Sequence, residues 1–165
     1  MTTAAVFEVR GVSGRVFIYG THDSYPDGWP TLAVKYIAKN TGKTLNDVAK
    51  GVLEAVRKWD YETHMQTADL YNYGGWKETE REVKRWVLND FRIVKDSDVP
   101  KNLEKGWEYW YVVNLSKGTI TVKHVKAVMC RDTDEYGGGI YVCGEKELTE
   151  FKGTLNEYLN MYEHR

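Results

Sequence analysis

The sequence predicts an α+β fold in which an antiparallel sheet built from hairpins packs against helices. Three observations support this prediction. Runs of alternating apolar and polar residues, bounded by glycine-containing turns, occur at the start of the chain and again after residue 106. Apolar residues at helical spacing occupy most of the chain between these two regions. The regular strand–helix–strand alternation that is typical of parallel nucleotide-binding sheets does not occur.

The first 30 residues predict a hairpin followed by a loop. Residues 5–10 and 15–19 alternate as strands around a turn with glycine at each end, so the hairpin covers about residues 5–22. The segment that continues to Pro30 contains two prolines and two glycines, which argue against regular structure. We expect this loop to be ordered and held against the body, with Tyr25 partly buried, because its prolines stiffen the backbone.

Helices are predicted over about residues 31–41, 44–59 and 76–91. The second has the clearest pattern, since Thr44 is a suitable N-cap and an apolar stripe runs from Leu45 to Trp59. Residues 60–73 fit two interpretations, an extension of this helix or a packed aromatic loop. Gly74 and Gly75 end that segment.

Strands return in the last third of the chain. Hairpins are predicted over about residues 107–126, around a Ser-Lys-Gly turn, and over about residues 127–143, across an acidic, glycine-rich tip. A final helix is predicted over about residues 147–163. Its apolar face would consist of Leu148, Phe151, Leu155, Tyr158, Leu159 and Tyr162.

Length and charge narrow the classes of function. A chain of 165 residues has the usual size of one domain, so we expect residues 1–165 to form a single domain. The formal net charge is −1, with 23 basic and 24 acidic residues, which argues against nucleic acid as a partner. No window approaches the ~20 apolar residues of a membrane span, and the first residues lack a signal-peptide pattern. We therefore expect a cytoplasmic protein that makes no membrane contact.

Cys130 and Cys143 are too few for a secreted disulfide framework or for a zinc site built from cysteine alone. The chain has a single glutamine, Gln66, beside abundant Lys and Glu, which is a thermophile signal. In a hyperthermophile a cytosolic Cys130–Cys143 disulfide is compatible with the redox rules, so the state of the pair stays open.

The densest group of polar side chains follows the second predicted strand. His22 is a candidate general base, Asp23 or Asp27 is a candidate to orient it, and Tyr25 is a candidate donor to an anion. His22, Asp23 and Asp27 are therefore the catalytic candidates. The binding candidates are Tyr19, His22, Asp23, Tyr25, Asp27 and Trp29. These residue types also form ordinary turns, and a connector between sheet and helix is the more frequent role of such a loop.

Other chemistries lack a complete set of residues. His22, Asp23 and Asp27 offer metal-binding atoms, but their spacing fits no known loop, so we expect no metal site and no cofactor. His64 is expected to be structural. The triple glycine at 137–139 lacks the Lys-Ser/Thr of a phosphate-binding loop, and no Gly-x-Ser-x-Gly nucleophile motif occurs.

The segment RVFIYGTHDSYPDG, from Arg15 to Gly28, resembles a group of small uncharacterised proteins of phages, archaeal viruses and plasmids. In that group a strand ending in Tyr is followed by His, Asp, a Tyr-Pro pair and Gly. The hairpin from Glu108 to Val122 is similar to the second half of those proteins. Ser24 departs from the pattern, which has Gly there, and nothing between Ala38 and Gly106 takes part. The resemblance implies a virus or mobile element as the source, and it implies no activity.

We expect a non-enzymatic protein-binding module, because the chain is small, carries six Trp and twelve Tyr, and lacks a complete catalytic set. The expected partner is a host or viral protein, and exposed aromatic side chains would also suit a homo-oligomer. The alternative is a small hydrolase of a phosphorylated or nucleotide substrate, which uses the His22 loop with His64, Arg131 or Lys123. A third hypothesis is nucleic-acid binding by ring stacking on residues 107–113.

Overall fold

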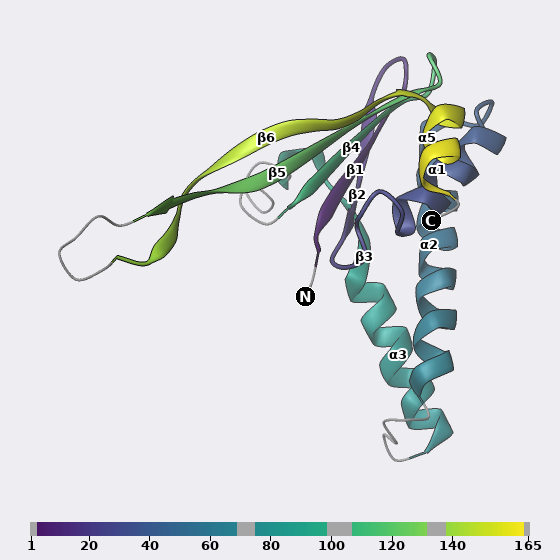
Figure 1. Ribbon diagram of the computed structural model, residues 1–165. Coiled ribbons are helices and arrows are strands. Elements are labelled where there is room, and N and C mark those ends of the chain that lie inside the picture. The colour runs from purple at the N-terminus through teal and green to yellow at the C-terminus, as the bar shows by residue number, and fades with distance from the viewer. Residues whose placement is uncertain (1–2, 69–74, 99–106, 132–137, 164–165) are drawn as a thin grey trace.

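The computed structural model describes residues 3–68, 75–98, 107–131 and 138–163, and it confirms the α+β class. A six-stranded sheet, antiparallel except for one parallel pair, packs against four helices (Figure 1). In chain order the elements are β1 (Ala5–Arg10), β2 (Arg15–Gly20), α1 (Trp29–Lys39), α2 (Leu45–Ala68), α3 (Trp76–Asp90), β3 (Phe91–Val94), a short 3-10 helix (Asp96–Asp98), β4 (Tyr109–Asn114), β5 (Thr119–Arg131), β6 (Ile140–Thr154) and α5 (Leu155–Tyr162). No helix in these segments is long and apolar enough to cross a membrane.

The strand order β3-β2-β1-β4-β5-β6 places β1 inside the sheet, between β2, which follows it in sequence, and β4, which is far from it in sequence. β1 pairs antiparallel with β2, as the hairpin pattern predicts. On its other side β1 pairs parallel with β4, from Ala5 opposite Tyr109 to Arg10 opposite Asn114. All residues of β1 except Arg10 are buried, as is typical of a strand covered on both faces.

The first three helices lie close to their predicted positions, and the second of them is longer than predicted. α1 begins at Trp29 with Pro30 in its first turn, where proline is well tolerated. α2 continues beyond Trp59 to Ala68, so the first part of the segment that fitted two interpretations is helical. α2 packs against α1 and α3, and its C-terminal half projects with α3 beyond the sheet (Figure 1).

The expected helix over residues 147–163 is wrong in its first half. Residues up to Thr154 belong to β6, where Leu148 and Phe151 pair with residues of β5. Thr154 then forms a capping box with Glu157, which starts α5 at the next residue. The apolar spacing of Leu148 and Phe151 fits a helix, but pairing with a neighbouring strand satisfies the backbone of this segment and overrides the local pattern.

Two further boundaries differ from the expectation. β5 runs without a break from Thr119 to Arg131, so the hairpins expected over 107–126 and 127–143 share one strand. Phe91, expected as a helix end, begins the short strand β3, which pairs antiparallel with β2. This pairing brings the end of α3 beside the end of β2.

The main core lies between one face of the sheet and helices α1, α2 and α5. Four buried rings form its centre, with centroids 5.4–5.8 Å apart in successive pairs: Tyr111, Phe7, Trp29 and Phe91. A smaller buried cluster of Val6, Phe17 and Val94 lies on the other face, where Trp107 and Trp110 pack against it. Much of the aromatic content is therefore packing.

Candidate functional site

The loop between β2 and α1 is held in place by buried hydrogen bonds, as predicted. The Tyr111 hydroxyl donates to the carbonyl oxygen of Ser24, and the Tyr158 hydroxyl donates to the carbonyl oxygen of Pro26, each over 2.5 Å. Ser24 Oγ accepts from Nε1 of Trp29 over 3.0 Å. Because both the backbone and the side chains of the loop are anchored, groups that it presents are preorganised.

Two of the expected binding residues, Trp29 and Tyr19, do not lie beside the catalytic candidate His22. Trp29 is fully buried in the core, so its side chain is not accessible to a partner. Tyr19 is half-buried on β2, where the guanidinium of Arg92 lies 4.9 Å from the centroid of its ring. Neither residue belongs to the group of side chains around His22 or to the hollow beside Tyr25 that are described below.

Tyr25 and Asp27 face a different part of the molecule from His22. Tyr25 is 42% exposed, in agreement with the expected partial burial, and its ring packs edge-on against Tyr109 at 5.9 Å. These two loop residues line a hollow of about 360 Å³ with Pro26, Tyr109, Glu150 and Tyr162. Asp23 is exposed, with a φ of 50° in the left-handed region that Asp tolerates.

His22 lies in a cluster of polar side chains from α2 and α3. Its Nε2 atom is 2.7 Å from Oδ1 of Asp60, and its Nδ1 atom is 3.6 Å from Oδ2 of Asp90. His64 lies one helical turn after Asp60, and its Nδ1 atom is 3.2 Å from Oδ1 of Asp60. One nitrogen or oxygen atom from each of the four residues lies within 4.8 Å of the other three. Two imidazoles and two carboxylates therefore meet at the base of the loop.

Sheet pairing explains how Asp90 reaches His22. Gly20 of β2 pairs with Phe91 of β3, so the residues that follow β2 lie beside the residue that precedes β3. The backbone N–H of Thr21 donates to the carbonyl oxygen of Asp90 (3.0 Å), and the Thr21 hydroxyl donates to its Oδ1 atom (3.2 Å). Asp90 is thereby oriented toward the imidazole.

The electrostatics of the cluster favour a cation. The hydrogen bond with Asp60 raises the pKa of His22 above its ordinary value of 6.5, and burial opposes this rise. Burial also raises the pKa of Asp90 above its ordinary 3.8, while nearby His22 lowers it by a smaller amount. Positive charge at His22 is therefore stabilised by the carboxylates around it.

Sequence reasoning found His22 and, for the hydrolase alternative, offered His64 as one of three partners, but it missed Asp60 and Asp90 as neighbours of His22. A signal existed for one pair, because Asp and His four residues apart share a helix face. The sequence left open whether residues 60–73 are helical, so it did not establish that Asp60 and His64 share such a face, and His64 was expected to be structural. For Asp90 the sequence carries no signal, since its position depends on the β2–β3 pairing.

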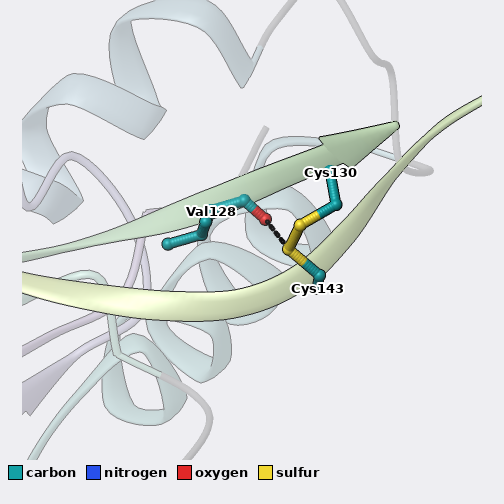
Figure 2. The surroundings of a disulfide bond; sticks show 3 residues. All are labelled: Val128, Cys130 and Cys143. Atoms are coloured by element: carbon teal, nitrogen blue, oxygen red, sulfur yellow. Dashed lines mark hydrogen bonds between the residues drawn. A yellow bond between two sulfur atoms is a disulfide. The ribbon is translucent and has the colours of Figure 1, made fainter. Parts of the chain in front are cut away.

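A second candidate site is the arm, defined here as Val125–Arg131 of β5 and Ile140–Glu147 of β6. β4 pairs with β5 only up to His124, so the arm is a two-stranded ribbon. Figure 1 shows it projecting from the body on the side away from the helices. Cys130 and Cys143 form a disulfide across the two strands, with their Cα atoms 5.7 Å apart (Figure 2). Figure 2 also shows the Val128 carbonyl oxygen close to Cys143.

The arm exposes apolar side chains on both of its faces. Those between 40% and 64% exposed are Val128, Met129, Ile140, Tyr141 and Val142. Met129 pairs with Val142, and the next residue on each strand forms the neighbouring pair Cys130–Tyr141. Because successive side chains of a strand point to opposite faces, these pairs lie on opposite sides of the ribbon.

An aromatic binding surface is not found in the described segments. Their exposed rings are those of Tyr25, Trp76 and Tyr141, which lie on a loop, a helix and the arm. The rings expected to stack on nucleic acid are packed instead: Trp107 contacts Trp110 edge-on at 5.1 Å, and Tyr111 is buried. The exposed apolar surface of the arm is mainly aliphatic.

Comparison with protein-family models, with curated proteins and with solved structures finds no match to this chain.

Proposed function

We propose that the protein is a non-enzymatic protein-binding module and that the arm is the element that contacts its partner. The observation that carries this proposal is the run of exposed aliphatic side chains on a ribbon that projects from the body. The partner is a host or viral protein, or a second copy of this chain, that covers the arm through apolar contacts.

Burial of the arm would be favourable. Complete burial of an aliphatic side chain contributes about 1.5–3 kcal/mol, so covering five side chains that are already half-buried contributes about 1 kcal/mol each. A two-stranded ribbon alone is marginally stable in water. The Cys130–Cys143 disulfide offsets this by holding the strands together before binding, which lowers the entropy lost on association.

The charge of the arm, counted together with residues 132–139 that join its two strands in sequence, supports a protein as partner. Between residues 125 and 147 the sequence has three basic residues, Lys126, Arg131 and Lys146. It has five acidic ones: Asp132, Asp134, Glu135, Glu145 and Glu147. The difference, 3 − 5 = −2, opposes contact with phosphate. Apolar contact is therefore the main source of affinity that this ribbon offers.

The disulfide also bears on location. Intracellular disulfides are rare outside hyperthermophiles, and secreted or periplasmic proteins retain them. The cytoplasmic location expected from the sequence thus depends on a thermophilic source, and we propose it only together with that source.

A photoreactive amino acid placed at Tyr141 tests the proposal. The full chain carrying it is irradiated in an extract of the cells that produce the protein, and adducts are identified by mass spectrometry. We expect one discrete adduct, whose mass shows whether the partner is another protein or a second copy. Val142→Lys should lower its yield about tenfold, whereas Leu88→Lys should not. Leu88 is a matched control because the exposed fractions are 58% for Leu88 and 59% for Val142.

The same photoreactive residue at Trp76, which is 62% exposed on α3, controls for non-specific capture. Equal yields from Trp76 and Tyr141 would contradict the proposal. So would an adduct that survives Val142→Lys unchanged.

A second candidate function, hydrolysis of a phosphorylated or nucleotide substrate, is favoured by the contact of His22 with the Asp60–His64 pair. This contact supplies the additional polar groups that the loop alone lacks. The test is turnover of bis-p-nitrophenyl phosphate and nucleoside triphosphates by wild type and His22→Ala. Activity that is equal in both proteins would rule out the loop as its source.

A further inference from the structure

The four side chains of the His22 cluster form a compact set of metal-binding atoms. We propose that His22, Asp60, His64 and Asp90 bind one divalent transition-metal ion, for which Zn²⁺ is the best fit. This site is separate from the arm, so it does not depend on the proposed protein-binding function.

A buried oxygen without a partner is the strongest sign of a ligand. Asp60 is 1% exposed, and its Oδ1 atom faces both His22 and His64. Its Oδ2 atom is buried and has no hydrogen-bond partner among the described residues. A buried carboxylate oxygen in this state is costly, and coordination of a cation offsets that cost.

The spacing of the donors suits a small ion. Zinc ligands lie about 2.0–2.2 Å from the metal, so tetrahedral ligand atoms are about 3.3–3.6 Å apart. In the structure the four donor atoms lie within 4.8 Å of one another, so binding of the ion requires them to move closer together by roughly 1 Å. The side chains of His22, Asp90 and His64 are 20–31% exposed and have room for this movement.

The types of donor atom select the class of metal. Mg²⁺ and Ca²⁺ prefer sites made only of oxygen atoms, whereas two imidazoles with two carboxylates suit zinc and neighbouring transition metals. The ring of His64 is already oriented, since its Nδ1 atom lies 2.8 Å from the carbonyl oxygen of Asp60. Histidine ligands of metals commonly donate their second N–H to such a carbonyl group, so the nitrogen of His64 that would bind the ion is Nε2.

A metal-free cluster is the competing explanation, in which protonated His22 balances Asp60. The two explanations differ in their response to metal. An ion bound by residues from the β2–α1 loop, α2 and α3 would join three parts of the fold, and binding to the native state alone would stabilise it. An ion pair between His22 and Asp60 would leave the thermal stability independent of Zn²⁺.

The test uses untagged full-length protein treated with EDTA and dialysed into metal-free buffer. Zn²⁺ binding is measured by competition with a chromophoric chelator, and Co²⁺ is used as a spectroscopic probe. We expect one Zn²⁺ per chain and visible Co²⁺ absorption without the thiolate charge-transfer band, because both cysteines are in the disulfide. Free Zn²⁺ about 100-fold above the Kd should raise the Tm by about 5–10 °C.

Two variants assign the ligands. His64→Gln and Asp90→Asn should each weaken Zn²⁺ binding about tenfold or more, and His124→Gln on β5 should leave it unchanged. Circular dichroism checks that each variant is folded, and either variant alone is sufficient for the assignment. Absence of Zn²⁺ binding at micromolar concentration, or binding that neither variant weakens, would overturn the proposal.

Discussion

Two buried tyrosines make the stability of this protein sensitive to alkaline pH. The hydroxyls of Tyr111 and Tyr158 donate to carbonyl oxygens of the loop between β2 and α1, and both side chains are fully buried. Burial raises the pKa of each hydroxyl above its ordinary value of 10, and the rise is large for both. The nearby Tyr109, which has a pKa raised to about 12, follows the same direction.

Proton linkage gives the direction in which the stability of the fold changes with pH. Above pH 10 the unfolded chain releases its tyrosine protons while folded Tyr111 and Tyr158 keep theirs, so ionisation favours the unfolded state. The contribution of the two protonated hydroxyls to stability is therefore fully present below pH 10 and is lost as the pH rises above it. One group whose folded pKa lies well above 11 accounts for a loss of about 1.4 kcal/mol between pH 9 and pH 11, and two groups account for about 2.7 kcal/mol.

The double variant Tyr111→Phe/Tyr158→Phe removes both ionisations. Urea unfolding followed by circular dichroism at pH 9 and pH 11 measures the loss of unfolding free energy in each protein. Wild type should lose about 2.7 kcal/mol more than the variant, because all other titrating groups are common to both. Equal losses in the two proteins would refute the reasoning. The variant should also be less stable at pH 9 by roughly 1–3 kcal/mol, since two buried carbonyl oxygens lose their donors.

Three other substitutions test the packing that positions the loop and α5. Gly20→Ala should destabilise the fold by about 1–3 kcal/mol in thermal unfolding, because the added Cβ would lie 2.6 Å from the buried Trp29 ring. Gly42→Ala is the control and should have little effect, since no atom lies within 4 Å of its new Cβ. Equal Tm values for the two variants would contradict this packing. Ser24→Ala should cost about 1–3 kcal/mol by leaving the indole N–H of Trp29 without an acceptor, and a change below about 0.5 kcal/mol in urea unfolding would argue against that bond. Thr154→Ala should cost about 1 kcal/mol, measured in the same way, by removing the capping box of α5, and an unchanged value would show that packing alone starts this helix.

Local patterns were sufficient wherever short-range interactions define an element. The β1–β2 hairpin follows from alternating residues around a glycine turn, and the antiparallel pairing of the two strands confirms it. α2 follows from Thr44 and the stripe behind it, and Thr44 Oγ1 accepts from the N–H of Asp47 (3.2 Å). The anchored loop also followed from local signals, because prolines and large rings restrict the chain without reference to distant residues.

Tertiary structure decided what local patterns leave ambiguous. The spacing of Leu148 and Phe151 fits a helix, and pairing with the neighbouring strand β5 nevertheless made both residues part of β6. The parallel β1–β4 pairing and the β2–β3 pairing join residues far apart in sequence, which no local propensity specifies. The His22 cluster depends on the second of these pairings, since Asp90 reaches the imidazole only because β3 lies beside β2. The residue types and the stiffness of the loop are determined by the sequence by itself. The meeting of two imidazoles and two carboxylates is determined by the tertiary structure, because it requires the loop, α2 and α3 to come together at one place.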